Sequence, residues 1–240
     1  MKLVLLFVCF VCQVFSQTKE INYSGQVWMA ENLNVVTFRN GDPIPHARTK
    51  KEWQNAEKNK QPAWCYYNNN PLHKFKYGKL YNWYAVIDNR GLAPKGWHIP
   101  TNNDWEILIY NLGDEYESGI KLKSVKGWNS VDGVRQCSMC KNWTSEQKAA
   151  KKCKTCKSNG MIETKTSGNG TNEIGFNGYP CGLRMPDGSF DLFGMNAFWW
   201  TYPTDEKKNS SFRGLYDYDI GIGLHEDHHG VGLNVRCLKD

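Results

Sequence analysis

The sequence lacks an apolar run long enough to cross a membrane. Its longest apolar run, residues 3–16, has about fourteen residues, short of the roughly 20 that a membrane-spanning helix needs. The run follows Lys2 and ends just before Gln17, in the pattern of a signal peptide and its cleavage site. Cys9 and Cys12 lack the small preceding residue of a lipid-modified cysteine. We therefore expect residues 1–16 to be a signal peptide, and the mature chain to be secreted or held at the cell surface (extracellular or periplasmic), without a membrane span.

The sequence also lacks the short motifs of common catalytic centres. It contains no nucleophile elbow, no His-Glu-x-x-His, no phosphate-binding glycine loop and no acid pair in a fixed context. We therefore expect a protein that is not an enzyme.

Basic residues are not spread along the chain. The formal net charge is +6, but much of the excess lies within residues 141–165. A nucleic-acid-binding face needs basic residues distributed over a surface with interleaved aromatic residues. This distribution, together with the expected export, argues against a nucleic-acid partner.

Large aromatic residues and glycine are abundant. Ten tryptophans, twelve tyrosines and 22 glycines predict an α+β fold with many turns around aromatic anchors. Residues 26–29 have the pattern of a short strand, and residues 231–237 that of a terminal antiparallel strand. Residues 64–67 and 80–86 are aromatic core segments that we expect to pack on each other.

Two helices are predicted from their capping boxes. Thr49 is followed three residues later by Glu52, and Thr101 is followed by Asp104 at the same spacing. The first helix should turn Trp53 and Ala56 inward and end before Pro62, and Gly113 should end the second. The inward face of the second helix is predicted to carry Trp105, Leu108, Ile109 and Leu112.

Six ordered motifs carry a resemblance to a known family. They are residues 26–34 (QVWMAENLN), 77–85 (YGKLYNWYA), 94–100 (PKGWHIP), 170–176 (GTNEIGF), 198–200 (FWW) and 235–237 (VRC). Together they resemble the Fibrobacter succinogenes major paralogous domain, a family of exported bacterial proteins. The resemblance covers nearly the whole mature chain, residues 17–240. The chain departs from the family pattern at Ala93-Pro94 and at Pro180-Cys181.

This resemblance implies a C-type-lectin-like domain. Such a fold has two helices, a small antiparallel sheet that joins the chain ends, and a second sheet with long loops. It implies a surface-binding or adhesion role by analogy only. The Glu-Pro-Asn or Gln-Pro-Asp triplet of calcium-dependent sugar-binding lectins is absent from the sequence. We recognise no calcium site.

A cysteine-rich insertion, resembling a zinc ribbon, is predicted at residues 129–168, where lysine, cysteine, serine and asparagine replace aliphatic residues. Two Cys-x-x-Cys pairs separated by twelve residues place four thiolates within reach of one tetrahedral Zn²⁺. We therefore predict a structural zinc site. The alternatives are disulfides, which an oxidising compartment favours, and a redox dithiol. The predicted zinc ligands are Cys137, Cys140, Cys153 and Cys156.

Three further cysteines, Cys65, Cys181 and Cys237, form at most one pair. The lectin-like habit of securing the terminal strand implies a disulfide between Cys65 and Cys237. A nucleophilic role is the alternative for Cys181, although no histidine partner can be recognised.

Aromatic residues near the C-terminal end are candidate ligand contacts. Tyr202, Tyr216 and Tyr218 have polar neighbours, so we expect partly exposed rings that offer flat faces to a sugar. Trp199 and Trp200 are weaker candidates for the same role. Core packing is the alternative for all five, and it is the expectation for Trp83, Trp97 and Trp105. The histidines of residues 225–229 are expected to lie in a solvated loop, with metal binding as the alternative.

Three functions agree with these features of the sequence. The first is an exported, non-catalytic binding or adhesion module that contacts carbohydrate or another surface protein. The second is a structural cell-surface component that displays the zinc-stapled insertion. A remote third is a thiol- or metal-dependent oxidase related to formylglycine-generating enzymes, whose terminal sequence is not found here.

Overall fold

The computed structural model describes residues 19–136, 161–204 and 210–240. The predicted signal peptide and the four cysteines of the insertion lie outside these residues. The fold is α+β, with few helices and several small antiparallel sheets, as the composition predicts. In the part of the chain that is described, no helix is long and apolar enough to cross a membrane.

Both predicted helices are confirmed. Thr49 caps α1, and Thr101 caps α3, each through a complete capping box. Trp53 and Ala56 are buried on α1, and Trp105 is buried on α3. The helices span Lys50–Lys58 (α1), Trp83–Val86 (α2), Asn102–Asn111 (α3) and Ser118–Leu122 (α4), with 3-10 turns at Tyr67–Asn69 (η1) and Pro71–Phe75 (η2).

The short helices were not predicted, because each has too few residues to show a helical period. Residues 80–86, predicted to be one aromatic core segment, divide into strand β4 and helix α2. The Asn82 side chain accepts a hydrogen bond from the Ala85 backbone and so begins the helix.

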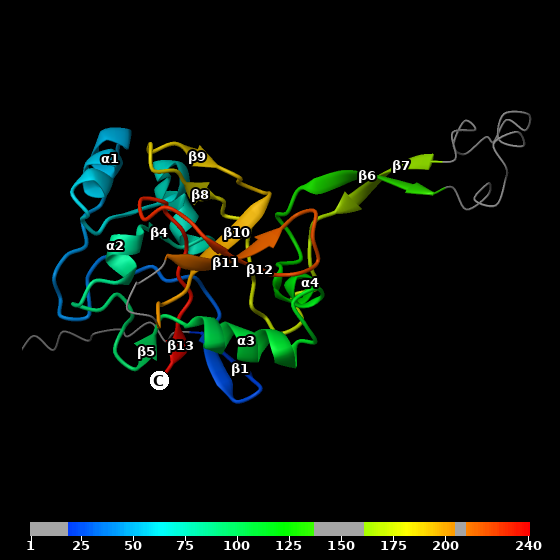
Figure 1. The fold of residues 1–240 in the computed structure, drawn as a ribbon, viewed down its shortest axis with the longest axis horizontal. Coiled ribbons are helices and arrows are strands. Elements are labelled where there is room, and N and C mark those ends of the chain that lie inside the picture. The colour runs from blue at the N-terminus through cyan, green and yellow to red at the C-terminus, as the bar shows by residue number, and fades with distance from the viewer. Residues whose placement is uncertain (1–18, 137–160, 205–209) are drawn as a thin grey trace, which may run out of the picture.

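A four-stranded sheet joins the two ends of the described chain (Figure 1). Its order is β1-β2-β13-β5, and the predicted strand at residues 26–29 is its second member. A three-stranded sheet, β10-β11-β12, forms the second large unit. The strands are Glu20–Tyr23 (β1), Gln26–Met29 (β2), Trp97–His98 (β5), Leu238–Lys239 (β13), Asn196–Trp200 (β10), Ser211–Tyr216 (β11) and Gly223–Glu226 (β12).

Three two-stranded sheets complete the described architecture. In the first, Trp64 pairs with Tyr81 and Cys65 with Leu80, so the two aromatic segments pack on each other as predicted. The strands are Trp64–Cys65 (β3) with Leu80–Tyr81 (β4), Ser130–Gln136 (β6) with Met161–Ser167 (β7), and Leu183–Arg184 (β8) with Phe190–Asp191 (β9).

The terminal segment 231–237 differs from its prediction. A regular strand begins only at Leu238, and the preceding residues form single bridges from Leu233 to Tyr81 and from Asn234 to Trp199. Gly232 also bridges to Arg184 on β8, so the segment contacts strands of three different sheets and no single partner extends a ladder along it. Its side chains are nevertheless buried throughout.

The β6–β7 hairpin projects away from the rest of the molecule (Figure 1). Its register runs from Ser130 opposite Ser167 to Gln136 opposite Met161. The hairpin therefore lies within the segment 129–168 that the composition marked as an insertion. The residues between its strands, 137–160, are outside the description.

Aromatic side chains dominate the core. Trp28, Trp105 and Trp199 pack with Phe176 in one cluster, and Trp83 with Trp200 in another. Core packing is thus confirmed for Trp83, Trp97 and Trp105. It also applies to Trp199 and Trp200, which are fully buried and offer no face to a ligand.

Candidate functional site

Two of the three predicted tyrosines lie together at the end of β11. Tyr216 is half-buried as the last residue of the strand, and Tyr218 follows in the turn with 68% of its surface exposed. Their ring centroids are 5.4 Å apart, with an interplanar angle of 33°. The pair therefore presents aromatic surface to solvent, as the sequence predicted.

A histidine from the neighbouring strand holds the ring of Tyr216, the half-buried member of the pair. The Tyr216 hydroxyl lies 2.5 Å from Nε2 of His225 on β12. Burial raises the pKa of Tyr216 to about 12, so its hydroxyl keeps its proton at neutral pH. This proton is donated to Nε2 in the imidazole tautomer that carries its own proton on Nδ1. The contact holds the Tyr216 ring in one orientation.

These side chains line a cavity of about 430 Å³. One wall comes from the loop between α3 and α4, where Tyr116 is 71% exposed, and the other comes from the β11–β12 turn. The lining residues are Glu115, Tyr116, Tyr216, Tyr218, Asp219, Gly221, Ile222, Gly223, Leu224 and His225.

The two walls are tied together through the backbone. Ile222 donates its N–H to the Glu115 carbonyl at 2.8 Å, and Ile120 donates to the Ile220 carbonyl at 2.7 Å. A Cβ on Gly119 would lie 1.8 Å from the Gly221 carbonyl oxygen. The segments that contain Gly119 and Gly221 approach this closely only because residue 119 has no side chain.

A second hollow, of about 370 Å³, continues the cavity toward α3. The two share Glu115 and Leu224, and the second adds Tyr110, which is 81% exposed. We call the combined surface the tyrosine groove, defined by the cavity residues above together with Glu106, Ile109, Tyr110, Gly113, Asp114 and Arg213.

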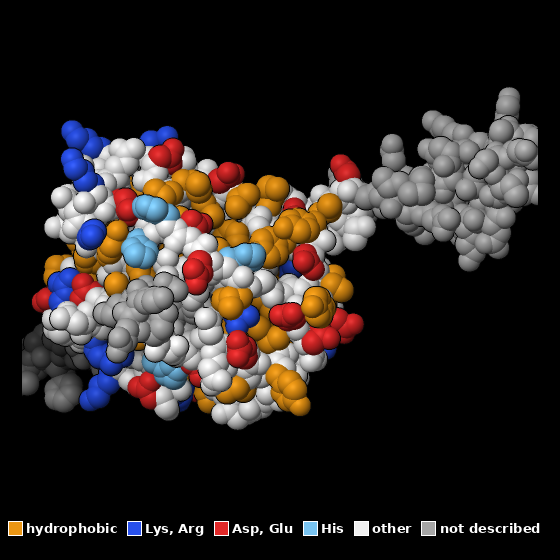
Figure 2. Space-filling model, viewed as in Figure 1, with side chains coloured by type: hydrophobic (Ala, Val, Ile, Leu, Met, Phe, Trp, Pro, Cys, Tyr) orange, Lys and Arg blue, Asp and Glu red, His pale blue; other side chains and the backbone are white. Residues whose placement is uncertain are grey.

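The groove is acidic. Four of its lining residues are carboxylates, and its one arginine or lysine, Arg213, is buried and lies 3.5 Å from Glu106. Figure 2 shows acidic and hydrophobic side chains together on the side that carries α3, α4 and β12, whereas lysine and arginine gather near α1 and β5. The carboxylates are Glu106, Asp114, Glu115 and Asp219.

The third predicted tyrosine is elsewhere. Tyr202 is 42% exposed and lines a separate hollow of about 270 Å³ with Arg39, Asp88 and His98. Its backbone N–H is held by the Pro100 carbonyl at 2.8 Å. Tyr202 is therefore exposed as predicted, but it is not part of the tyrosine groove.

The groove includes tyrosines that sequence reasoning missed. Tyr110 and Tyr116 flank Gly113, at the end of a helix whose inward face had been assigned to other residues. The predicted inward face of this helix leaves Tyr110 on the outer face. An aromatic residue on an exposed helix face is a signal that could have pointed to a binding surface. Nothing local connected it with Tyr218.

The predicted disulfide is not formed in the structure. Cys65, Cys181 and Cys237 are free, buried thiols. Cys65 and Cys181 share one core cluster, whereas Cys237 belongs to another, so Cys65 has the wrong neighbour for the expected pair. Burial raises the pKa of Cys65 and of Cys237 to about 12, and raises that of Cys181 further.

The predicted zinc ligands Cys137, Cys140, Cys153 and Cys156 lie outside the described residues. Within the residues that are described, no group of three or more histidine, cysteine or acidic side chains is arranged to hold a metal ion.

The histidines of residues 225–229 contact different partners. His225 meets Tyr216, Nδ1 of His228 lies 3.3 Å from Glu57, and His229 stacks on Trp83. Each of the three is therefore directed to a different neighbour.

Comparison with protein families places nearly the whole chain in a known family. The family model of the Fibrobacter succinogenes major domain matches residues 21–239. No curated protein and no solved structure matches the chain. The tyrosine groove and the six motifs all lie inside the matched range.

Proposed function

Because the chain belongs to the Fibrobacter succinogenes major domain family, we propose that it is an exported, non-catalytic binding module on a C-type-lectin-like scaffold. Its ligand is carbohydrate, and the ligand-binding surface is the tyrosine groove. The observation that carries this proposal is the convergence of Tyr116, Tyr216 and Tyr218 from two distant chain segments on one open cavity.

The side chains suit a sugar ring. Aromatic faces pack against the C–H groups of a pyranose, and hydroxyl and carboxylate oxygens accept hydrogen bonds from its hydroxyls. Tyr116 and Tyr218 supply exposed rings, and Glu115 and Asp219 lie beside them. Exposed tyrosines also lose little conformational freedom on binding, since each has only two rotatable side-chain bonds.

The charge of the groove favours a neutral glycan. A negatively charged sugar would face four carboxylates, while the guanidinium of Arg213 is already beside Glu106. Repulsion between like charges disfavours such a ligand. A neutral oligosaccharide long enough to contact both hollows meets no such cost.

The buried thiols support a non-catalytic role. A thiol-dependent oxidase needs an accessible thiolate, because the thiolate is the reactive form. Cys65, Cys181 and Cys237 are buried, and their pKa values are raised by that burial.

Zinc at the four-cysteine segment remains part of the proposal. The β6–β7 ladder pairs Gln136 with Met161, so the two described residues that flank 137–160 lie opposite each other. This pairing supports a stapled unit in which Cys137, Cys140, Cys153 and Cys156 would hold a structural Zn²⁺.

The projecting hairpin favours a second candidate, a structural cell-surface component that displays the insertion to a protein partner. The β6–β7 hairpin extends away from the domain (Figure 1). A display role puts the binding surface in the insertion, whereas the leading proposal puts it in the tyrosine groove.

A glycan array distinguishes the two candidates. The mature chain and a variant lacking residues 137–160, closed by an Asn-Gly turn, are compared on the same array. We expect both to bind the same neutral glycans. Binding by the full chain that disappears in the deletion variant favours display, and binding by neither overturns the carbohydrate proposal.

A further inference from the structure

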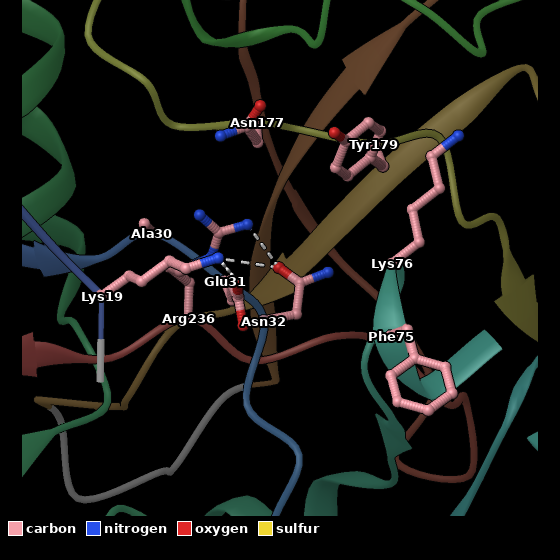
Figure 3. Close-up of a pocket in the computed structure, with 9 residues that line it drawn as sticks. All are labelled: Lys19, Ala30, Glu31, Asn32, Phe75, Lys76, Asn177, Tyr179 and Arg236. Carbon is pink, nitrogen blue, oxygen red and sulfur yellow. Dashed lines mark hydrogen bonds and ion pairs between the residues drawn. The ribbon is translucent and has the colours of Figure 1, made fainter. Parts of the chain in front are cut away.

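A second pocket has a basic lining, in contrast to the acidic lining of the tyrosine groove. The pocket has a volume of about 210 Å³. Figure 3 shows Lys19 and Arg236 on one side of it and Phe75, Lys76 and Tyr179 on the other. We call it the arginine pocket. Ala30, Glu31, Asn32 and Asn177 complete its lining.

The guanidinium of Arg236 is buried without an anion. Only 1% of the residue is exposed, and among the ion pairs of the described chain none includes it. Nε and Nη2 donate to Asn32 Oδ1, and Nη1 donates to the Met29 and Phe176 carbonyls. Since a guanidinium has five N–H groups, one on Nη2 is left without an acceptor among the described residues.

Burying an unbalanced charge is costly. Burial lowers the pKa of Arg236 to about 9. The Phe176 ring, whose centroid is 4.2 Å from the guanidinium carbon, offsets part of this cost. Glu31 acts on this charge from the pocket lining, but no carboxylate of the described residues lies within ion-pair distance of it, so an anion bound in the pocket would gain a direct charge contact.

The rest of the lining adds positive charge. Lys19 lies 3.0 Å from Glu31 and is thereby balanced. Lys76 is exposed, makes no ion pair among the described residues, and lies over the Tyr179 ring at 4.7 Å. Three cations and one carboxylate therefore line the pocket, which gives a net charge of +2.

We propose that the arginine pocket binds the carboxylate of a single acidic sugar residue, such as a hexuronate. The free N–H on Nη2 of Arg236 and the ammonium of Lys76 suit a ligand with a single negative charge. The Phe75 and Tyr179 rings beside them offer faces to the sugar ring. The cavity is below the roughly 300 Å³ at which sites for larger ligands begin, so it admits one ring rather than a chain.

This site is independent of the tyrosine groove, and the two differ in charge. An acidic sugar is repelled by the groove and attracted here. Either site can therefore be disproved without the other.

The test is an NMR titration of the mature chain with sodium D-glucuronate, D-glucose and inorganic phosphate. We expect glucuronate to shift the Arg236 Nε–H signal, glucose to have no effect, and phosphate to bind more weakly. Raising the salt concentration should weaken binding. Equal binding of glucose, or phosphate binding as tight as glucuronate, overturns the assignment, as does failure of glucuronate to bind the folded chain.

Variants locate the site. Lys76→Gln should weaken glucuronate binding by roughly fivefold to tenfold, the effect of one lost charge contact. Lys95→Gln removes the same charge from an exposed position outside the pocket and should have no effect. Tyr218→Ala should also leave glucuronate binding intact. An equal loss in Lys76→Gln and Lys95→Gln shows that only net charge matters and contradicts the pocket.

Discussion

The Asn32 side-chain oxygen accepts two hydrogen bonds from the Arg236 guanidinium, 2.6 and 3.0 Å long, across 204 residues of sequence. The same oxygen accepts the indole N–H of Trp199 at 2.8 Å. The amide nitrogen of Asn32 donates to the Tyr77 carbonyl. One buried asparagine thus joins four of the six motifs, which explains them as structural elements of the fold.

Replacing Asn32 should destabilise the whole domain. Asn32→Leu leaves the guanidinium of Arg236 and the indole of Trp199 without their acceptor, so we expect a loss of about 3–5 kcal/mol in the free energy of unfolding. Urea unfolding measures it. Asn22→Ala, at an exposed position on β1, is the control and should change stability by less than about 0.5 kcal/mol. Similar values for the two variants would falsify the structural role.

Close packing of two glycine-containing segments shapes the tyrosine groove. Gly119→Ala places a methyl group against the Gly221 carbonyl, so we expect a loss of about 2–3 kcal/mol in stability. Ser118→Ala next to it is the control, because the buried Ser118 hydroxyl has no hydrogen-bond partner in the part of the chain that the structure describes. Removing that hydroxyl should be neutral or stabilising. A tolerated Gly119→Ala contradicts the described approach of α4 to the β11–β12 turn.

The three core thiols should make the protein less stable in alkali. Their pKa values are raised in the folded chain, from an ordinary value of 9.0 to about 12 for Cys65 and Cys237. Above pH 9 the unfolded chain releases protons that the folded chain keeps. The free energy of unfolding therefore falls as pH rises from 9 to 12, and this contribution is fully present below pH 9.

Thiol reactivity checks the same point directly. In a mature chain with serine at Cys137, Cys140, Cys153 and Cys156, iodoacetamide at pH 8.5 should modify none of the remaining thiols until guanidinium chloride is added. It should then modify all three. One fast-reacting thiol in the folded chain contradicts the buried state and reopens a nucleophilic role for Cys181.

The insertion should be separable from the domain. Deleting residues 137–160 and closing Gln136 to Met161 with an Asn-Gly turn keeps the β6–β7 ladder. We expect the melting temperature to change by less than about 3 °C, and native mass spectrometry to show loss of one bound zinc relative to the full chain. A full chain without metal contradicts the zinc proposal.

Local signals in the sequence predicted the local structure. The capping boxes at Thr49 and Thr101 determine where α1 and α3 begin, and both follow from residues three positions apart. The polar neighbours of Tyr218 likewise predicted its exposure. Signals of this kind need no knowledge of distant segments.

Features that depend on distant contacts could not be predicted. Tyr116 and Tyr218 lie about a hundred residues apart in sequence, and backbone bonds such as that from Ile222 to Glu115 bring them together. The choice of partner for Cys65 failed for the same reason, because the core cluster that places it with Cys181 has no local signature. The burial of Trp199 beside Asn32 was equally hidden.

The most direct test of the carbohydrate proposal is calorimetric titration of the best neutral glycan from the array into the mature chain and two tyrosine variants. Tyr218→Ala removes an exposed ring of the groove, and Tyr202→Ala removes an exposed ring outside it. We expect Tyr218→Ala to weaken binding by about tenfold or more, and Tyr202→Ala to bind like the unmodified chain. Equal affinity of the unmodified chain and Tyr218→Ala would contradict the assignment of the tyrosine groove.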